Sequence, residues 1–389
     1  MQTTTQLSAV LRERIRHRAP LTKLLRGTVT FEPAGHAPFS LVLHHQDMRV
    51  VAGRVRRPDT TVIADPATLA EVIAGTHSGV DAFLAGRLRV RGNLALGLKL
   101  DSLFTFPLRP VHVTRANFVD AGGVRTFFLE AGEGEPVVLL HGLGATNASM
   151  LPTLAALSRR YRVIAPDNPG FGESDKPRVA YHAAFYAQWL TTFLDVLEIP
   201  RAHFIGNSMG GRIALEMGIR HPGRTAKLVL LAPSMAWMRF RQFAPLVRLL
   251  MPELAFMPLL LPRRRVMQGL KLMFAKPERL QPGWYEAAVD EFQRVFRSPR
   301  GRIAFFSAAR QIYLEESHGD NGFWQRLPSI ESPALFFWGT HDRLVPARFA
   351  HHATRALPHA QSIVLAECGH VPQFELPDET HRLILDFLA

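Results

Sequence analysis

The stretch of sequence that decides the fold is HFIGNSMGGRIALE, residues 203–216. It begins with a short strand-like run, His203 to Ile205, and ends with the helical pattern of residues 211–216. Between them stands Gly206-Asn207-Ser208-Met209-Gly210, the G-x-S-x-G pattern of a strained turn that exposes a serine at the end of a strand. Because bulky neighbours would collide with the strand and the helix, this context predicts that Ser208 is a nucleophile.

A serine hydroxyl needs a base to take its proton, and the base needs an acid to fix its tautomer. His370 follows the strand-like run Ser362 to Leu365, and Asp342 follows the run Ala334 to Trp338. The order serine, acid, histidine along the chain is the order of the fold in which this turn occurs. A lone histidine is more often a surface or core residue, but three residues at three strand ends predict a Ser208–His370–Asp342 catalytic triad.

Acyl transfer at a serine also needs N–H donors for the oxyanion that develops. The backbone N–H of Met209, next to the nucleophile, is one candidate, and that of Leu143, in the loop after His141-Gly142, is the other. We expect His141 and the turn of residues 167–172 to shape loops, and Cys368 to be a small buried side chain. The sequence has no metal-ligand spacing of His or Cys and no phosphate-binding glycine loop, so we expect no metal and no cofactor.

From about residue 111, short apolar runs alternate with longer helical segments. This alternation predicts an α/β architecture, a parallel sheet covered by helices on both faces. It stops between Ser234 and Pro328, where the sequence is rich in Met, Phe, Leu, Arg and Pro and predicts helices. A helical cap over about residues 234–328 would lie above the carboxyl ends of the strands, where such sheets bind ligands. The runs expected as strands are 137–140, 161–164, 203–205, 228–231, 334–338 and 362–365.

The first 110 residues follow a different pattern and form a separate domain, with Pro107 and Pro110 at its boundary to residues 111–389. Asp65-Pro66 and Gly75 have the residue types that start and end a helix. The segment from Leu94 to Phe104 satisfies helical and alternating spacing alike, so periodicity leaves its structure open. A second short helix and a half-exposed strand are expected over residues 78–85 and 87–91.

The chain has 389 residues and a net charge of +13, with +8 in residues 1–116 and +7 in residues 234–328. These blocks favour contact with an anionic membrane; because they lack interleaved aromatics and glycines, we expect no nucleic-acid partner. Apolar residues make up 47% and charged residues 20%, which is typical of a soluble globular protein. The single cysteine, Cys368, fits a reducing compartment, and four arginines within residues 1–20 interrupt the apolar run that a signal peptide needs. We therefore expect a cytoplasmic protein that lies at the inner face of the membrane where it meets lipid. Composition leaves the oligomeric state open.

From residue 111 to 389 the sequence resembles the α/β-hydrolase superfamily, in the branch of capped esterases, lipases and carbon–carbon bond hydrolases. The Asn-Ser-Met-Gly-Gly run is similar to that of hydrolases of aromatic ring-fission products, but Ala145-Thr146-Asn147 departs from the glycine- and proline-containing loop of those enzymes. Ser208, in place of an aspartate, argues against epoxide hydrolase and haloalkane dehalogenase activity. The residues that carry the resemblance are His141-Gly142, Asp167 to Gly172, Ser174 to Pro177, Gly206 to Gly211, Gly339 with Asp342, and Gly369-His370.

Residues 1 to about 108 resemble a lipid-binding domain of the sterol carrier protein type, an α+β domain. The resemblance rests on Thr61 to Pro66, on Phe83 to Asn93 and on the Leu-rich segment that follows. In that family the Leu-rich segment is a helix, and the domain encloses an apolar tunnel for acyl chains or sterols. The resemblance therefore implies a helix over Leu94 to Phe104 and a lipophilic ligand.

Together these observations predict an esterase or lipase that cleaves a lipophilic acyl ester through an acyl-enzyme. The mixture of basic and apolar residues in Met238 to Leu250 and in Leu259 to Arg265 is typical of interfacial helices, and equally of a cap that packs on the core. One alternative is a carbon–carbon hydrolase of ring-fission ketones. Another is a lipid-binding or transfer protein with a vestigial hydrolase domain. The sequence does not separate hydrolysis from acyl transfer to an alcohol.

Overall fold

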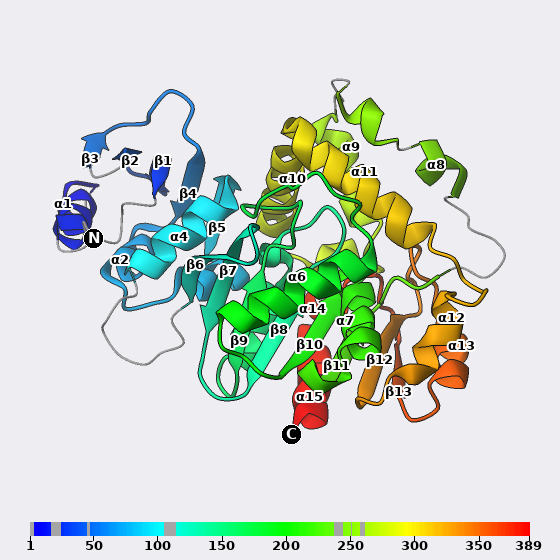
Figure 1. Cartoon of the computed structure of the whole chain (residues 1–389). Helices are drawn as coiled ribbons and strands as arrows, with labels where there is room; N and C mark the ends of the chain where they lie inside the picture. Colours follow the sequence, from blue (N-terminus) through cyan, green and yellow to red (C-terminus); the bar gives the residue numbers. More distant parts are fainter. Residues whose placement is uncertain are drawn as a thin grey trace.

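The computed structural model describes residues 4–16, 25–44, 47–104, 114–236, 244–249, 251–256 and 261–389. Two sheets organise these residues, a smaller one within residues 26–92 and a larger one within residues 115–365 (Figure 1). The boundary expected at Pro107 and Pro110 lies outside the described residues, as does most of the expected interfacial segment from Met238 to Leu250.

The N-terminal domain is an α+β unit. Its elements are β1 (Arg26–Pro33), β2 (Phe39–His44), β3 (Asp47–Ala52), β4 (Thr60–Ala64), β5 (Leu88–Gly92), α1 (Thr4–Arg16), α2 (Pro66–Ala74), α3 (Gly79–Leu84) and α4 (Leu94–Phe104). The strands lie in the order β3-β2-β1-β4-β5, with β1 and β4 parallel and the other neighbours antiparallel. Of these strands, only β5 was predicted from the sequence.

Local signals explain the helices of this domain. Asp65 accepts the Thr68 N–H over 2.9 Å at the start of α2, and Gly75 ends that helix with φ 71°, a left-handed conformation that favours glycine. The segment that periodicity left open is the helix α4. The Asn93 side chain caps it by accepting the Leu96 N–H over 3.1 Å.

The larger sheet contains β6 (Arg115–Asp120), β7 (Arg125–Ala131), β8 (Pro136–Leu140), β9 (Arg162–Pro166), β10 (Ala202–Asn207), β11 (Thr225–Leu231), β12 (Ala334–Gly339) and β13 (Gln361–Leu365). Their order is β13-β12-β11-β10-β8-β9-β7-β6. The six strands predicted from the sequence, β8 to β13, are parallel to one another. β7 runs antiparallel to β9, and β6 runs antiparallel to β7, so the sheet is mixed and two strands longer than the sequence predicted.

Helices cover both faces of the larger sheet. Val138 and Leu140 of β8 belong to the apolar cluster that includes α6 (Ala183–Val196) and α7 (Met209–Arg220). Val137 and Leu139 belong to the opposite cluster, with α5 (Leu151–Leu157) and α15 (Pro377–Leu388). Alternate residues of one strand are therefore buried on opposite sides, which is why these strands are apolar throughout. The shorter elements are η2 (Asn147–Met150), η3 (Pro222–Arg224), α13 (Phe349–Ala356) and α14 (Pro372–Glu375).

The segment between β11 and β12 forms the helical cap. Its described elements are α8 (Ala244–Leu249), η4 (Pro252–Phe256), α9 (Arg263–Lys271), η5 (Pro277–Arg279), α10 (Pro282–Arg297), α11 (Pro299–Tyr313), α12 (Phe323–Arg326) and η6 (Leu327–Ser329). Figure 1 shows α9, α10 and α11 above one end of the larger sheet, and β5 of the N-terminal domain packs against α10. None of the helices in the described ranges is long and apolar enough to cross a membrane.

Candidate active site

The predicted nucleophile turn forms at the junction of β10 and α7. Ser208 has φ 54° and ψ −115°, a backbone conformation that residues other than glycine rarely adopt. A Cβ on Gly206 would lie 2.3 Å from the carbonyl carbon of Gly210, and a Cβ on Gly210 would lie 2.0 Å from the Leu140 carbonyl oxygen. Close packing therefore requires both glycines. The strained turn is held in part by the Ser208 N–H, which donates to Leu231 O over 3.0 Å.

The structure brings the predicted base and acid together. His370 Nδ1–H donates to Asp342 Oδ2 over 2.8 Å, and both side chains are buried. The other carboxylate oxygen, Asp342 Oδ1, accepts the N–H groups of Leu344 over 2.8 Å and Val345 over 2.9 Å. A carboxylate held in this way keeps the imidazole proton on Nδ1 and leaves Nε2 unprotonated, the tautomer that a general base needs.

Ser208 and His370 line the same cavity. Between these two described residues, the serine hydroxyl and the imidazole ring form no hydrogen bond. Catalytic contacts of this kind are often long without substrate and shorten in the reacting complex. The structure thus contains the hydrogen bond between His370 and Asp342, whereas proton transfer from Ser208 to His370 stays a prediction.

Asn207, to which the sequence pattern assigned no role, ties the serine turn to the histidine loop. Its side-chain Nδ2 donates to Leu231 O over 2.9 Å and to His370 O over 3.0 Å. The nucleophile's own neighbour therefore fixes the backbone of the predicted base. Asn207 stands beside the nucleophile in the sequence, but the residue that its side chain contacts, His370, lies 163 residues away.

Glu375 joins the histidine loop to the cap and was also missed. Its buried carboxylate accepts the Gly369 N–H over 2.7 Å and the Lys276 N–H over 2.6 Å. The His370 N–H in turn donates to Met273 O of the cap over 2.7 Å. The position of His370 therefore depends on the cap as well as on the sheet.

The two N–H groups predicted to stabilise an oxyanion belong to residues that line the cavity, Leu143 and Met209. Met209 is the first residue of α7, so its N–H has no partner within the helix. The loop that carries Leu143 passes beside the nucleophile, since a Cβ on Gly142 would lie 3.4 Å from Ser208 Cβ. The arrangement suits the predicted role, which remains a prediction.

His141 holds loops together, as the sequence suggested. Its Nδ1–H donates to Gly142 O over 2.8 Å, and its Nε2 accepts the Asn168 N–H over 2.9 Å. Burial lowers the pKa of His141 to about 4, so the ring is neutral at pH 7. Burial also raises the pKa of the Cys368 thiol to about 12, which leaves it inert as a nucleophile.

Two family models match the chain, the alpha/beta hydrolase fold over residues 135–377 and the SCP-2 sterol transfer family over residues 8–105. The chain belongs to the alpha/beta hydrolase fold family. It carries an SCP-2 sterol transfer domain at its N-terminus. Both resemblances drawn from the sequence are thereby confirmed.

The relatives and structural neighbours of this hydrolase include dienoate hydrolases and a membrane phospholipase A. The 2-hydroxy-6-oxo-6-phenylhexa-2,4-dienoate hydrolase of Burkholderia cepacia is 31% identical over 67% of this chain and 90% of its own length. The crystal structure of a hydrolase with the same substrate name from Rhodococcus sp. strain RHA1 has a TM-score of 0.60 and 26% identity, covering 72% of this chain and 99% of its own. The crystal structure of a membrane phospholipase A has a TM-score of 0.61 and 25% identity, covering 83% of this chain and 95% of its own.

The cavity that this hydrolase forms at Ser208 and His370, here called the Ser208 cavity, has a volume of about 490 Å³. This volume lies in the range of small-molecule sites. Its walls are largely apolar, and among the described lining residues there is no lysine or arginine. Glu291 also lines the cavity, but its carboxylate accepts the Leu94 N–H over 2.9 Å and pairs with Arg294 over 2.8 Å.

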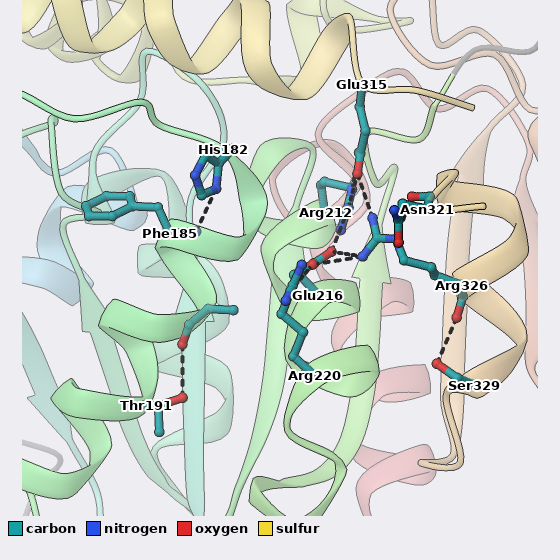
Figure 2. Close-up of polar contacts among 11 residues, drawn as sticks. His182, Phe185, Thr191, Arg212, Glu216, Arg220, Glu315, Asn321, Arg326 and Ser329 are labelled. Carbon is teal, nitrogen blue, oxygen red and sulfur yellow. Dashed lines mark hydrogen bonds and ion pairs between the residues drawn. The ribbon is translucent and has the colours of Figure 1, made fainter. Parts of the chain in front are cut away.

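A buried ion-pair cluster connects the helix after the nucleophile to the base of the cap (Figure 2). Arg212 of α7 is fully buried and pairs with Glu216 over 2.7 Å and with Glu315, which follows α11. Arg326 of α12 donates to both carboxylates over 2.9 Å. Burial alone would raise the pKa of Glu216, but the surrounding guanidinium groups lower it to about 2. This cluster fixes the cap relative to α7.

Within the described ranges, the hydrolase has no group of three or more His, Cys, Asp or Glu side chains placed to hold a metal ion. The residues gathered at the Ser208 cavity are instead those of acid–base and nucleophilic chemistry.

Proposed function

We propose that the chain is a serine hydrolase that cleaves neutral, lipophilic acyl esters. Ser208 Oγ attacks the ester carbonyl while His370 Nε2 takes the serine proton, and the N–H groups of Leu143 and Met209 stabilise the oxyanion. When the tetrahedral intermediate collapses, the bond to the alcohol breaks and His370 returns the proton to the leaving alcohol. Water deprotonated by His370 then releases the acyl group from Ser208 as a carboxylic acid, and Asp342 orients the ring throughout.

The chemistry of the Ser208 cavity carries the neutral and lipophilic part of the proposal. Its described lining has no cation, and the carboxylate of Glu291 is already engaged. Burying a substrate carboxylate without a cation costs several kcal/mol, whereas each methylene group buried gains about 0.8 kcal/mol. The cavity therefore favours a neutral ester with a long chain over an anionic dienoate.

The test is a comparison of kcat/KM across p-nitrophenyl esters from acetate to palmitate, with 2-hydroxy-6-oxo-6-phenylhexa-2,4-dienoate measured in parallel. We expect kcat/KM to rise with chain length and to exceed that for the dienoate. Equal values for all the esters would contradict the lipophilic part of the proposal.

Carbon–carbon bond hydrolysis of ring-fission ketones is the second candidate. It is favoured by the 31% identity with the Burkholderia cepacia enzyme and by the similar run from Asn207 to Gly211. Under this alternative the dienoate is turned over faster than every ester in the series. The same experiment therefore decides between the two candidates.

A third possibility is a lipid carrier whose hydrolase domain is vestigial. A fluorophosphonate probe separates this from an enzyme, because it reacts only with an activated serine. We expect labelling of the wild-type chain, loss of labelling in Ser208→Ala, and retained labelling in Ser149→Ala, a control serine in the same cavity. Equal labelling of wild type and Ser208→Ala, or none of either, would refute catalysis at Ser208.

We further propose that the cap contacts an anionic membrane. Leu249, Met251 and Phe256 are exposed on the cap, where basic charge exceeds acidic charge. Flotation with vesicles of phosphatidylcholine containing phosphatidylglycerol should recover the protein, and vesicles of phosphatidylcholine alone should not. Equal recovery from both, or undiminished recovery of Phe256→Asp, would contradict this contact.

A further inference from the structure

A second apolar cavity lies inside the N-terminal domain and adjoins the Ser208 cavity. This N-terminal cavity is walled by side chains that include Val62, Val80, Val90, Leu98 and Phe104. Phe83 and Leu94 line both cavities. The two cavities therefore share a wall that includes two apolar side chains, while Asp101 also lines the N-terminal cavity.

The backbones of the two shared residues are both held by the cap helix α10. Trp284 Nε1–H donates to Phe83 O over 3.0 Å, and the Leu94 N–H donates to Glu291 over 2.9 Å. Close by, Asp290 accepts the Gly92 N–H over 2.9 Å. The N-terminal domain is thus fixed to the cap at the point where its cavity meets the Ser208 cavity.

Core packing is also continuous across this contact. Phe83 and Leu94 belong to one apolar cluster with Ala287 of α10 and Leu151 of α5. Two domains joined by a shared core and by backbone hydrogen bonds keep one relative position, unlike domains that touch through a small polar surface. The shared wall is therefore a lasting feature of the fold.

The N-terminal cavity is too small to hold a lipid. Its volume is about 50 Å³, and a single water molecule needs about 10–15 Å³ in such a measure. A few methylene groups fit, but a sterol or a whole acyl chain does not. As an extension of the Ser208 cavity, however, this space suits the end of a chain whose carbonyl lies at Ser208.

We propose that the acyl chain of the substrate runs from Ser208 to the wall formed by Phe83 and Leu94, and that its end enters the N-terminal cavity. The SCP-2 type domain then acts as the far end of the hydrolase's acyl pocket, and Phe83 and Leu94 set chain-length specificity. This inference rests on the proposed ester hydrolase function.

Filling the N-terminal cavity tests the proposal. Gly97 lines only that cavity, and a Cβ added there meets Val90 at 3.7 Å and Thr60 at 4.0 Å, ordinary contact distances. Gly97→Leu should therefore fold and occupy the space. Since each methylene group removed from an apolar contact weakens binding about fourfold, excluding two should lower the palmitate-to-butyrate ratio of kcat/KM about fifteenfold. Gly223→Leu is the matched control, because nothing lies within 4 Å of a Cβ at Gly223.

Opening the wall gives an independent second variant. Phe83→Ala removes one of the two side chains that line both cavities but keeps the carbonyl bonded to Trp284. The preferred acyl chain should become longer in this variant. Thermal unfolding shows whether each variant is folded.

Two outcomes are distinguishable. If the wild-type chain turns over none of the esters, the proposed function fails and the inference fails with it. If the esters are turned over but neither folded Gly97→Leu nor folded Phe83→Ala changes the chain-length profile relative to Gly223→Leu, the inference alone is overturned.

Discussion

Replacing Asp342 by asparagine removes the negative charge of the proposed triad's acid while almost keeping the shape of its side chain. Asp342 Oδ1 accepts two backbone N–H groups, from Leu344 and Val345, so the asparagine oxygen must take that place and its NH₂ group must face His370. Because an NH₂ group cannot accept Nδ1–H, the ring must carry its proton on Nε2, where it can no longer accept one from Ser208. We expect kcat to fall about 10⁴-fold, which corresponds to about 5 kcal/mol of transition-state stabilisation.

The assay is kcat for p-nitrophenyl butyrate, with circular dichroism to verify the fold. Asp386→Asn is a matched control, since this exposed carboxylate on α15 pairs with Arg382 at the surface and should affect kcat by less than about twofold. If Asp342→Asn kept more than about a tenth of the wild-type kcat, Asp342 would not be the acid that fixes the tautomer, and the proposed triad would be wrong.

Gly210→Ala places a Cβ 2.0 Å from the Leu140 carbonyl oxygen, so activity and soluble yield should be lost. Gly269→Ala on α9, where nothing lies within 4 Å of the added Cβ, should instead raise the free energy of unfolding by about 0.5–1 kcal/mol. Equal melting temperatures of Gly210→Ala and Gly269→Ala would contradict this contrast. Glu216→Gln should lower the free energy of unfolding in urea by about 3–5 kcal/mol, because it leaves buried guanidinium charge uncompensated. A loss below about 1 kcal/mol would show that the cluster does not hold the cap. Because burial lowers the pKa of His141 from 6.5 to about 4, the unfolded chain binds a proton that the folded chain does not. The contribution of His141 to the free energy of unfolding should therefore fall as the pH decreases from about 6.5 to about 4, by up to about 3 kcal/mol. Because burial also lowers the pKa of His381 to about 4 and raises that of Asp101 to about 6, the measurement is the difference between wild type and His141→Gln in urea denaturation, and a difference that does not change with pH would contradict the burial of a neutral ring.

The nucleophile turn was predictable because its determinants are local. Gly206, Ser208 and Gly210 lie within five consecutive positions between a strand pattern and a helix pattern, and steric exclusion acts within that short stretch. The caps at Asp65 and Gly75 were predictable for the same reason. Periodicity left the helix α4 open, since an amphipathic segment of that length fits both spacings.

The strands β1 to β4, β6 and β7 were not predicted. Their pairing partners, such as Phe31 with Phe39 and Phe118 with Phe127, become visible only once the register is set. The edge strand β6 has no fully buried side chain and so shows a weaker apolar run than the buried parallel strands β8 to β12. Sequence reasoning therefore found the parallel strands of the larger sheet and missed the antiparallel edge formed by β7 and β6.

By itself the sequence determined the serine turn, the positions of the parallel strands along the chain and the presence of two domains, because short-range sterics and apolar periodicity act along the chain. Only the tertiary structure decided which distant groups meet. Asn207 reaches the carbonyl of His370, and Glu291 reaches the backbone of Leu94, 197 residues away. Nothing in the sequence near either partner of such a contact indicates the other partner. The position of His370 and the wall shared by the two cavities therefore follow from tertiary packing alone.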